Sequence, residues 1–152
     1  MTGEEYLEQY RDATIEIDRL KWEYKQEMYL IENIRDPLGG DGTPRSGGVS
    51  QKVQDDAIHL QEKAEELKQF EVYALAVRQD IVRTINKVSE PAASVLMERF
   101  VRLPANGRFK TWREVADVVG YSEENVYTLR RKGLKEVEKM LRGHTFTVNY
   151  SI

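Results

Sequence analysis

Apolar residues recur in alternating steps of four and three along the first part of the chain, and no Gly or Pro interrupts them. Polar Glu27 takes one position of this seam, which otherwise consists of Tyr6, Tyr10, Ala13, Ile17, Leu20, Tyr24 and Ile31. A heptad pattern of this kind is typical of a helix that packs along another helix. We therefore expect one long helix from about Glu4 to Asp36, ended by Pro37.

Five Gly and two Pro fall within residues 36–50, a density that predicts a loop. Behind it the same rhythm returns from about Ser50 to Val88, broken only by Glu71 and Arg78. Its apolar positions are Val53, Ala57, Leu60, Ala64, Leu67, Ala74, Ile81, Ile85 and Val88. Two matched helices joined by one loop predict an antiparallel coiled-coil hairpin over residues 1–88.

Several large apolar side chains lie off the two predicted seams, namely Trp22, Tyr29, Phe70, Tyr73 and Val77. Two helices alone shield little surface, so these side chains need another partner. We therefore expect the chain to oligomerise through its long helices, most simply as a homodimer.

Three shorter helices are expected over residues 89–142. For the first, over 89–103, Ser89 is the expected N-cap and Pro91 falls in the first turn. The segment PANGRF, 104–109, is an expected turn. The second helix spans 111–119, where Thr111 and Glu114 have the spacing of a reciprocal capping box.

The third short helix is expected to begin behind the break Gly120-Tyr121-Ser122. Ser122 is its predicted cap, and the helix continues to about Leu141 with Gly143 as its stop. Two helices joined by about three residues that include Gly describe a helix-turn-helix. Both have an inner apolar face, made of Trp112, Val115, Ala116 and Val119 on one helix and Val126, Leu129, Gly133, Leu134 and Val137 on the other.

The tail 143–152 alternates apolar and polar residues, which is a strand pattern without another strand to pair with. A disordered terminus and a strand added across a dimer both remain open. The fold class expected for the whole chain is all-α.

Composition excludes several kinds of protein. The chain of 152 residues is 32% charged and 40% hydrophobic, with no cysteine, so disulfides, iron–sulfur clusters and Cys-based zinc sites are excluded. The acidic N-terminal segment lacks the apolar run of a signal peptide, and no stretch approaches the roughly 18 apolar residues of a membrane span. We expect a cytoplasmic protein without a membrane partner.

No catalytic, cofactor-binding or metal-binding motif stands out. The loop run GGDGTPRS lacks the Gly-Lys-Ser/Thr ending of a P-loop, and His59 and His144, the two histidines, lie far apart. The sequence therefore predicts neither an enzyme nor a bound cofactor or metal.

Charge is unevenly distributed along the chain. The net charge of −3 argues mildly against a nucleic-acid partner. Residues 89–142, however, carry 11 Lys and Arg against eight Asp and Glu, whereas residues 1–88 carry 12 against 18. The predicted helix-turn-helix is the basic part of the chain.

In a helix-turn-helix the second helix enters the major groove with its N-terminal end first. The face of this helix that points away from the predicted core carries Glu123, Glu124, Tyr127, Thr128, Arg130 and Arg131, and Lys132 is a further candidate contact to phosphates. Cationic side chains there suit phosphates, and polar ones suit base edges. Three packed helices with solvated faces are the alternative, and the two carboxylates favour it because phosphates repel them.

The runs MERF, 97–100, and TWREVADVVGYSEENVYTLRRKGLKEVEKML, 111–141, resemble region 4 of bacterial sigma factors. Together with the long helices and the run RSGGVSQKV, 45–53, they resemble phage-encoded late-gene transcriptional activators of the RinA and ArpU type. The resemblance covers residues 10–142 in layout and is sharpest over 97–141.

This resemblance implies DNA-facing roles for specific residues. Those matching Glu123, Glu124, Tyr127 and Thr128 face promoter bases in region 4, and those matching Thr111 and Trp112 lie by the DNA backbone, with Ser122 at the helix start. Glu123 and Tyr127 stand where Arg is usual, so the sigma consensus promoter is not implied. Gly133 stands where Ala is usual.

The resemblance implies a phage or prophage regulator of late genes that acts on double-stranded DNA in the host bacterium, beside host RNA polymerase. Sigma region 2 has no counterpart, so promoter melting is not implied. Two other functions stay open: a packaging protein like a small terminase subunit, which couples a helix-turn-helix to a helical oligomer, and a coiled-coil adaptor that binds polymerase without reading DNA.

Overall fold

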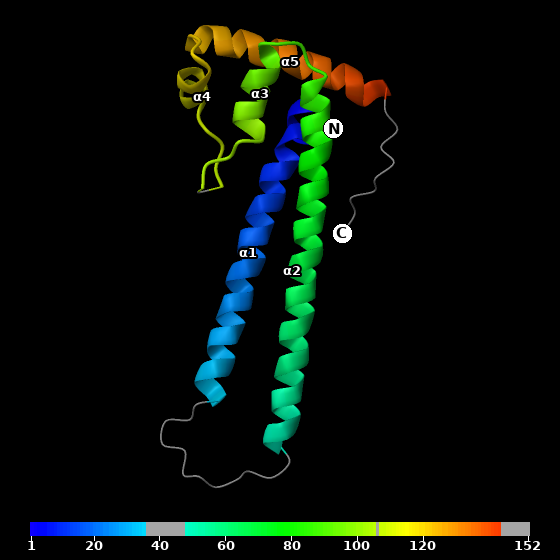
Figure 1. The fold of residues 1–152 in the computed structure, drawn as a ribbon, viewed down its shortest axis with the longest axis vertical. Coiled ribbons are helices and arrows are strands. Elements are labelled where there is room, and N and C mark those ends of the chain that lie inside the picture. Colours follow the sequence, from blue (N-terminus) through cyan, green and yellow to red (C-terminus); the bar gives the residue numbers. More distant parts are fainter. Residues whose placement is uncertain (36–47, 106, 144–152) are drawn as a thin grey trace. The chain divides into compact units, whose positions relative to one another are not determined.

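The chain is all-α in a computed structural model, which describes residues 1–35, 48–105 and 107–143 (Figure 1). Its helices in these ranges are α1 (Gly3–Arg35), α2 (Gly48–Asn86), α3 (Ala92–Phe100), α4 (Trp112–Val119) and α5 (Glu123–Gly143). No strand occurs within the same ranges. The predicted loop, apart from its last residues, and the tail beyond Gly143 lie outside the described residues.

The start of α1 is fixed by a cap that the sequence analysis did not identify. The Thr2 hydroxyl accepts a hydrogen bond from the Glu5 amide, and the Glu5 carboxylate accepts one from the Thr2 amide, each at 3.1 Å. Both contacts satisfy amide groups that the first helical turn leaves without partners. The spacing Thr-x-x-Glu was the available signal.

The region around Ser89 differs from the prediction. Helix α2 ends at Asn86 and α3 begins only at Ala92, with Pro91 as its N-cap residue and no side-chain cap. The predicted cap at Ser89 is wrong, because its hydroxyl donates to the Glu136 carboxylate at 3.0 Å. At its other end α3 stops at Phe100 rather than Leu103, in keeping with Pro104, which disfavours helical geometry in the residue before it.

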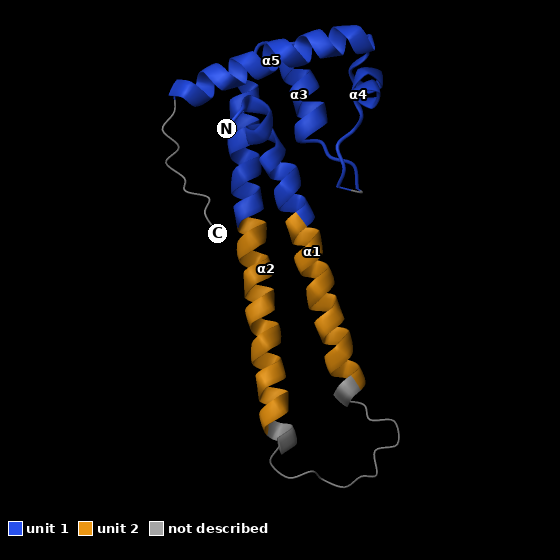
Figure 2. Ribbon diagram, turned by 180° about the vertical axis from the view of Figure 1, so that it is seen from behind, with its two compact units in different colours: residues 1–15, 73–152 blue, residues 16–72 orange. Residues whose placement is uncertain are grey.

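Two compact units are present (Figure 2): unit 1, residues 1–15 and 73–152, and unit 2, residues 16–72. Unit 1 thus contains the predicted module 89–142 together with the N-terminal turns of α1 and the C-terminal turns of α2. The division at residue 88 remains a sequence-based prediction.

In unit 2, the α1 and α2 segments are joined by ion pairs between the helices. Lys63 lies 3.5 Å from a Glu23 oxygen and 3.4 Å from a Glu27 oxygen, and His59 Nε2 lies 2.8 Å from the same Glu27 oxygen. Partial burial opposes the charge on Lys63, but the two carboxylates outweigh it and raise its pKa. The predicted seam position of Glu27 is therefore the site of a polar contact with α2.

Over part of its length, the packed face of α2 is displaced by one residue from the predicted seam. Leu60, Leu67, Ala74, Ile81 and Ile85 are buried or half-buried as predicted, but Val53 and Ala57 are exposed. Between Leu60 and Ile81 further packed positions are Lys63, Phe70 and Val77, whereas Ala64, Glu71 and Arg78 are exposed. Val88 is buried as well, but it lies beyond the end of α2. The expectation that Phe70, Tyr73 and Val77 lie off the packed face is therefore wrong, while Trp22 and Tyr29 remain exposed.

The core of unit 1 brings the helix ends together with α3, α4 and α5. Fully buried side chains come from every helix: Leu7 of α1, Ile81 and Ile85 of α2, Leu96 and Phe100 of α3, Val115 of α4, and Val126 and Val137 of α5. Buried Tyr6 donates from its hydroxyl to Asp80, and the same oxygen lies 2.9 Å from the Thr84 hydroxyl. The N-terminal turns of α1 are thus part of the support for α3–α5.

Candidate nucleic-acid interface

Helix α4 begins as the sequence predicts. The Thr111 side chain accepts a hydrogen bond from the Glu114 amide at 3.2 Å. The expected return contact from the Glu114 carboxylate to the Thr111 amide is replaced by another, because the Thr111 hydroxyl donates to that carboxylate at 3.1 Å. The predicted cap by the Thr111 side chain is confirmed, and only the contact of the Glu114 carboxylate differs from the prediction.

A turn of three residues joins α4 to α5. Gly120 adopts φ +78°, a left-handed conformation that glycine accepts without strain, and its amide donates to the Ala116 carbonyl at 2.9 Å. The Ser122 hydroxyl then accepts from the Asn125 amide at 3.2 Å and caps α5. Both predictions for this turn are confirmed.

The inner faces of α4 and α5 are buried as predicted. Val115 and Ala116 of α4 and Val126 and Leu129 of α5 belong to the core of unit 1. Gly133 lies against α3, since a Cβ atom built there would come within 2.9 Å of Leu96 Cδ1 and 3.4 Å of Ala92 Cβ. This close approach sets the position of α5 on α3.

The predicted contact residues at the start of α5 are mostly exposed. Ser122, Glu123, Glu124, Thr128, Arg131 and Lys132 all lie in solvent, and Tyr127 is 40% exposed. The Thr128 hydroxyl donates to the Glu124 carbonyl at 3.2 Å, which leaves its oxygen free to accept. Two carboxylates therefore lead this face, and the exposed cations Arg131 and Lys132 follow about two turns later.

Three further cations continue the outer face of α5 beyond the predicted set. Lys135, Lys139 and Arg142 are all exposed, and with Arg131 they follow one another at helical spacings of three and four. The signal was present in the sequence as basic residues at i, i+4, i+8 and i+11. The sequence analysis counted their charge but did not include them among the contact residues.

Trp112 is half-buried, and aromatic rings and guanidinium groups surround it. Its ring lies 6.4 Å from that of Phe100 and 6.2 Å from that of Tyr127. The guanidinium of Arg99 lies over it at 4.6 Å and that of Arg130 at 4.9 Å, and cation–π attraction favours both placements. Trp112 therefore positions α5 against α3 and α4 at the edge of the exposed face.

Arg130 differs from its neighbours, because it is only half-exposed. Its guanidinium pairs with Glu4 of α1 at 2.9 Å while it stacks on Trp112. The expectation that it points to solvent beside Arg131 is therefore wrong. The cause is the α1 turn, which lies over this side of α5: the Gly3 amide donates to Glu138 at 3.4 Å, and a Cβ on Gly3 would meet the Leu134 carbonyl at 3.1 Å.

Arg99 fixes the segment between α3 and α4. Its guanidinium stacks on Phe109 at 4.6 Å as well as on Trp112, and it donates to the Lys110 carbonyl. Burial, together with the nearby cations Arg130 and Arg11, holds the pKa of Arg99 below its usual value. This basic residue is a structural element of the module rather than a free cation.

Glu98 is a buried carboxylate, 5% exposed, between two cations. Lys110 donates to it at 2.8 Å and Arg102 pairs with it from the next turn. Burial alone would raise its pKa, but the hydrogen bonds and charges of Lys110 and Arg102 outweigh burial and lower the pKa below the ordinary value. Lys110 also donates to the Arg102 carbonyl at 3.0 Å, which ties the chain before α4 back onto α3.

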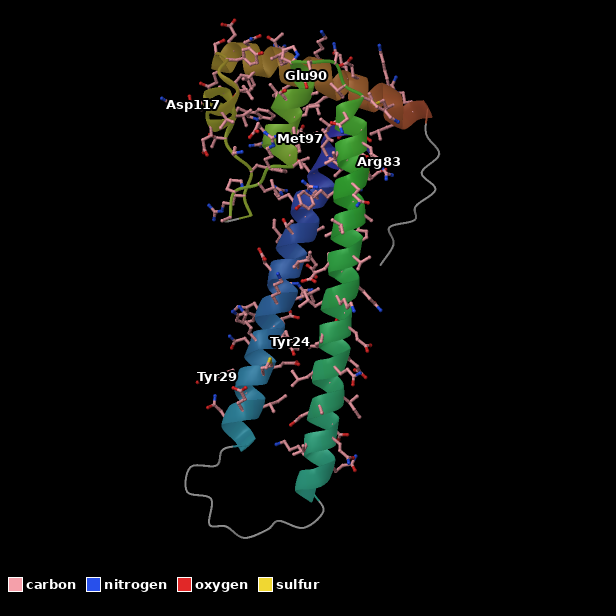
Figure 3. The ribbon with its side chains drawn as sticks, in the orientation of Figure 1. Tyr24, Tyr29, Arg83, Glu90, Met97 and Asp117 are labelled. Atoms are coloured by element: carbon pink, nitrogen blue, oxygen red, sulfur yellow. The ribbon has the colours of Figure 1, made fainter. Side chains whose placement is uncertain are left out.

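Beside α3 is a groove of about 460 Å³ whose lining includes Glu90, Met97, Glu98, Val118 and Tyr121. Figure 3 labels Glu90 and Met97 on this side of the fold.

Among the residues that the structure describes, no group of three or more His, Cys, Asp or Glu side chains could hold a metal ion. None of the described helices is both long enough and apolar enough to cross a bilayer.

Comparisons with protein-family models, with curated proteins and with solved structures returned no match to this chain. The resemblance to sigma region 4 and to phage late-gene activators therefore remains a prediction from the sequence.

Proposed function

We propose that residues 89–142 form a sigma region 4-like helix-turn-helix that binds double-stranded DNA, and that the protein is a transcriptional regulator. The observation that carries the proposal is the joint between α4 and α5: a three-residue turn with a left-handed Gly120, capped helices on both sides and a shared buried face. This joint leaves the outer face of the N-terminal half of α5 exposed, as a recognition helix requires.

The exposed residues divide into two roles. Tyr127 and Thr128, with Glu123 and Glu124, are the candidates for base contacts. A carboxylate can accept a hydrogen bond from cytosine, and a hydroxyl can donate or accept one. Arg131, Lys132, Lys135, Lys139 and Arg142 are candidates for phosphate contacts, since phosphate binding needs only charge and reach. Ser122 and Thr111 lie at helix N-termini, where amide groups favour a phosphate.

The resemblance extends the proposal to a phage or prophage activator of late genes. In this role, the long helices form a coiled-coil hairpin that oligomerises, and host RNA polymerase is the protein partner. The two leading carboxylates reduce the net positive charge of each module, and Glu4 already pairs with Arg130. A pair of modules, or polymerase beside one module, would therefore supply the affinity.

A binding assay with fluorescently labelled fragments of the source genome tests the proposal. We expect one or a few fragments to bind preferentially at low salt. Tyr127→Ala or Thr128→Ala should reduce the preference for the best fragment, whereas Arg131→Ala should weaken binding to every fragment alike. Absence of binding to all fragments at low salt would contradict direct DNA binding.

A second candidate function is an adaptor that binds polymerase without reading DNA. The observation in its favour is the pair of exposed carboxylates, Glu123 and Glu124, at the leading end of α5. A promoter-activation assay with Glu123→Gln and Thr128→Ala variants separates the two functions. Full activation by both variants, with no DNA affinity in the wild type, would favour the adaptor.

A further inference from the structure

The face of α1 opposite α2 carries an apolar stripe that nothing in the described chain covers. Trp22 is 62% exposed and Tyr29 is 63% exposed, and Ile15 precedes them at 51%. The three residues follow one another at seven-residue intervals, so they share one face of the helix. Figure 3 shows Tyr24 on the side of α1 that faces α2 and Tyr29 on the opposite side.

Charged residues accompany this stripe in alternating sign. Arg11, Asp18, Lys25 and Glu32 also follow at seven-residue intervals. Arg11 is half-buried, pairs with Asp12 at 3.1 Å and lies over the Phe109 ring at 4.2 Å, so it is not part of the exposed stripe. Asp18 and Lys25 are exposed, and neither takes part in an ion pair within the part of the chain that the structure describes.

We infer that this stripe, Ile15, Trp22 and Tyr29 with the flanking Asp18 and Lys25, is an interface that binds α1 of a second copy of the chain in antiparallel orientation about a two-fold axis. The inference concerns the interface between copies and does not depend on DNA binding.

The charge pattern selects this orientation. With a two-fold axis between residues 21 and 22, Asp18 of one copy meets Lys25 of the other, and the pair occurs twice by symmetry. In a parallel arrangement each residue would meet its own copy, so that carboxylates would face carboxylates and ammonium groups would face each other, which is repulsive.

The apolar residues fit the same axis. The two Trp22 side chains come together at the centre, and Ile15 of one copy falls within one residue, about 1.5 Å along the helix, of Tyr29 of the other. Large aromatic side chains near the centre of an interface with charges at its rim are the arrangement that stabilises protein association.

The outer face of α2 is a poorer partner. Ile58, 56% exposed, and Val72, 63% exposed, lie two heptads apart, but Glu65 stands between them. The middle position of the stripe on α2 is therefore the charged Glu65, whereas the middle position of the stripe on α1 is Trp22. Val72 therefore offers a matched control for an exposed apolar residue outside the interface.

Sedimentation equilibrium of the full chain tests the interface. The wild type should have twice the 17.7 kDa mass of one chain. Trp22→Glu and, separately, Tyr29→Glu should give monomers with unchanged helix content by circular dichroism, while Val72→Glu stays dimeric. A wild type that is monomeric at all concentrations, a ring of many copies, or dissociation by Val72→Glu but not by Trp22→Glu would overturn the inference.

A charge swap tests the orientation. Asp18→Lys places like charges opposite each other at both symmetry-related positions and should weaken the dimer about tenfold at low salt, since exposed pairs contribute up to about 1 kcal/mol each. The double variant Asp18→Lys, Lys25→Asp restores opposite charges and should recover wild-type affinity. Failure of the double variant to recover would contradict the antiparallel register.

The absence of cysteine from the chain allows a direct measurement of the register. Asp18→Cys mixed with Lys25→Cys should form a disulfide-linked heterodimer under mild oxidation. Lys25→Cys alone should not cross-link, because the two residues would lie about 10 Å apart along the helix, beyond disulfide reach. Efficient cross-linking of Lys25→Cys with itself would indicate a parallel dimer and overturn the inference.

Discussion

Arg130 and Arg131 are neighbours in the sequence, yet they have different surroundings. Arg131 lies in solvent, whereas Arg130 pairs with Glu4 at 2.9 Å and stacks on Trp112. A cation already paired with a carboxylate is less available to a phosphate. If α5 binds DNA, Glu4 competes with the phosphates for Arg130.

Glu4→Gln should therefore strengthen non-specific DNA binding at low salt, by about two- to fivefold for the release of a partly exposed ion pair. Fluorescence anisotropy with a random-sequence duplex measures the change. Glu5→Gln is the matched control: it removes one charge from the same turn and keeps the cap at Thr2, since Gln also serves in a capping box. Equal gains in both variants would show a net-charge effect rather than competition for Arg130.

Glu98 is the buried carboxylate of the part of the chain that the structure describes. Its pKa is lowered in the folded protein, so its contribution to the free energy of unfolding is present above the ordinary glutamate value of about 4.5 and is lost as the pH falls through the lower, folded value. We expect wild-type stability to fall below pH 4.5, as measured by urea denaturation at successive pH values.

Glu98→Gln should show a weaker fall over the same pH range and should be less stable at pH 7 by roughly 1–3 kcal/mol, because Lys110 keeps its half-buried place without a carboxylate. Glu62→Gln, which changes an exposed carboxylate of α2, should follow the wild-type curve. Parallel curves for wild type and Glu98→Gln would show that Glu98 is not the group responsible.

At the scale of helices, the best-predicted features depend on residues close together in sequence. Thr111, Gly120 and Ser122 act on backbone groups within four residues, so residue type and spacing were enough to predict the turn between α4 and α5. Ser89 had equally suitable chemistry, but Glu136, 47 residues away, takes its hydroxyl. The sequence alone could not show that competing partner.

The packed face of α2 shows a second limit. Leu67 and Ala74 were predicted correctly. After each of them, the predicted seam steps four positions, to Glu71 and Arg78, whereas the packed residue lies three positions on, at Phe70 and Val77. Both spacings put a residue on the same side of a helix. The two charged residues that interrupted the predicted seam were themselves the signal for the three-residue step.

The approach of α5 to α3 depends on Gly133. An alanine there would gain about 1 kcal/mol in helix propensity, but its Cβ would lie 2.9 Å from Cδ1 and 3.2 Å from Cγ of the fully buried Leu96 and 3.4 Å from Ala92 Cβ. We expect overpacking to outweigh the gain, so that Gly133→Ala lowers the free energy of unfolding by about 1–2 kcal/mol.

Thermal and urea denaturation measure this change. Gly143→Ala is the control, since a Cβ at that position of α5 meets nothing within 4 Å. A stabilisation of Gly133→Ala by about the helix-propensity difference would mean that α3 and α5 do not approach so closely.

At the scale of the whole molecule, the net charge of −3 is unevenly divided between the two compact units. Unit 1 carries 15 Lys and Arg against 13 Asp and Glu, and unit 2 carries eight against 13. The acidic turns at the start of α1 belong to unit 1, which keeps the charge of the candidate DNA-binding unit small. Affinity for DNA therefore depends on where its exposed cations lie and not on a strong overall field.

The salt dependence of DNA binding tests this distribution. Each phosphate contact that is lost should reduce the slope of log affinity against log salt concentration by about one. Arg131→Ala and Lys135→Ala should each produce that reduction. Lys68→Ala, which removes an exposed cation of unit 2, should leave the slope unchanged. All three variants change the net charge equally. A reduced slope in Lys68→Ala would therefore indicate that the total charge governs binding. An unchanged slope in Arg131→Ala and Lys135→Ala would show that the outer face of α5 is not the phosphate-binding surface.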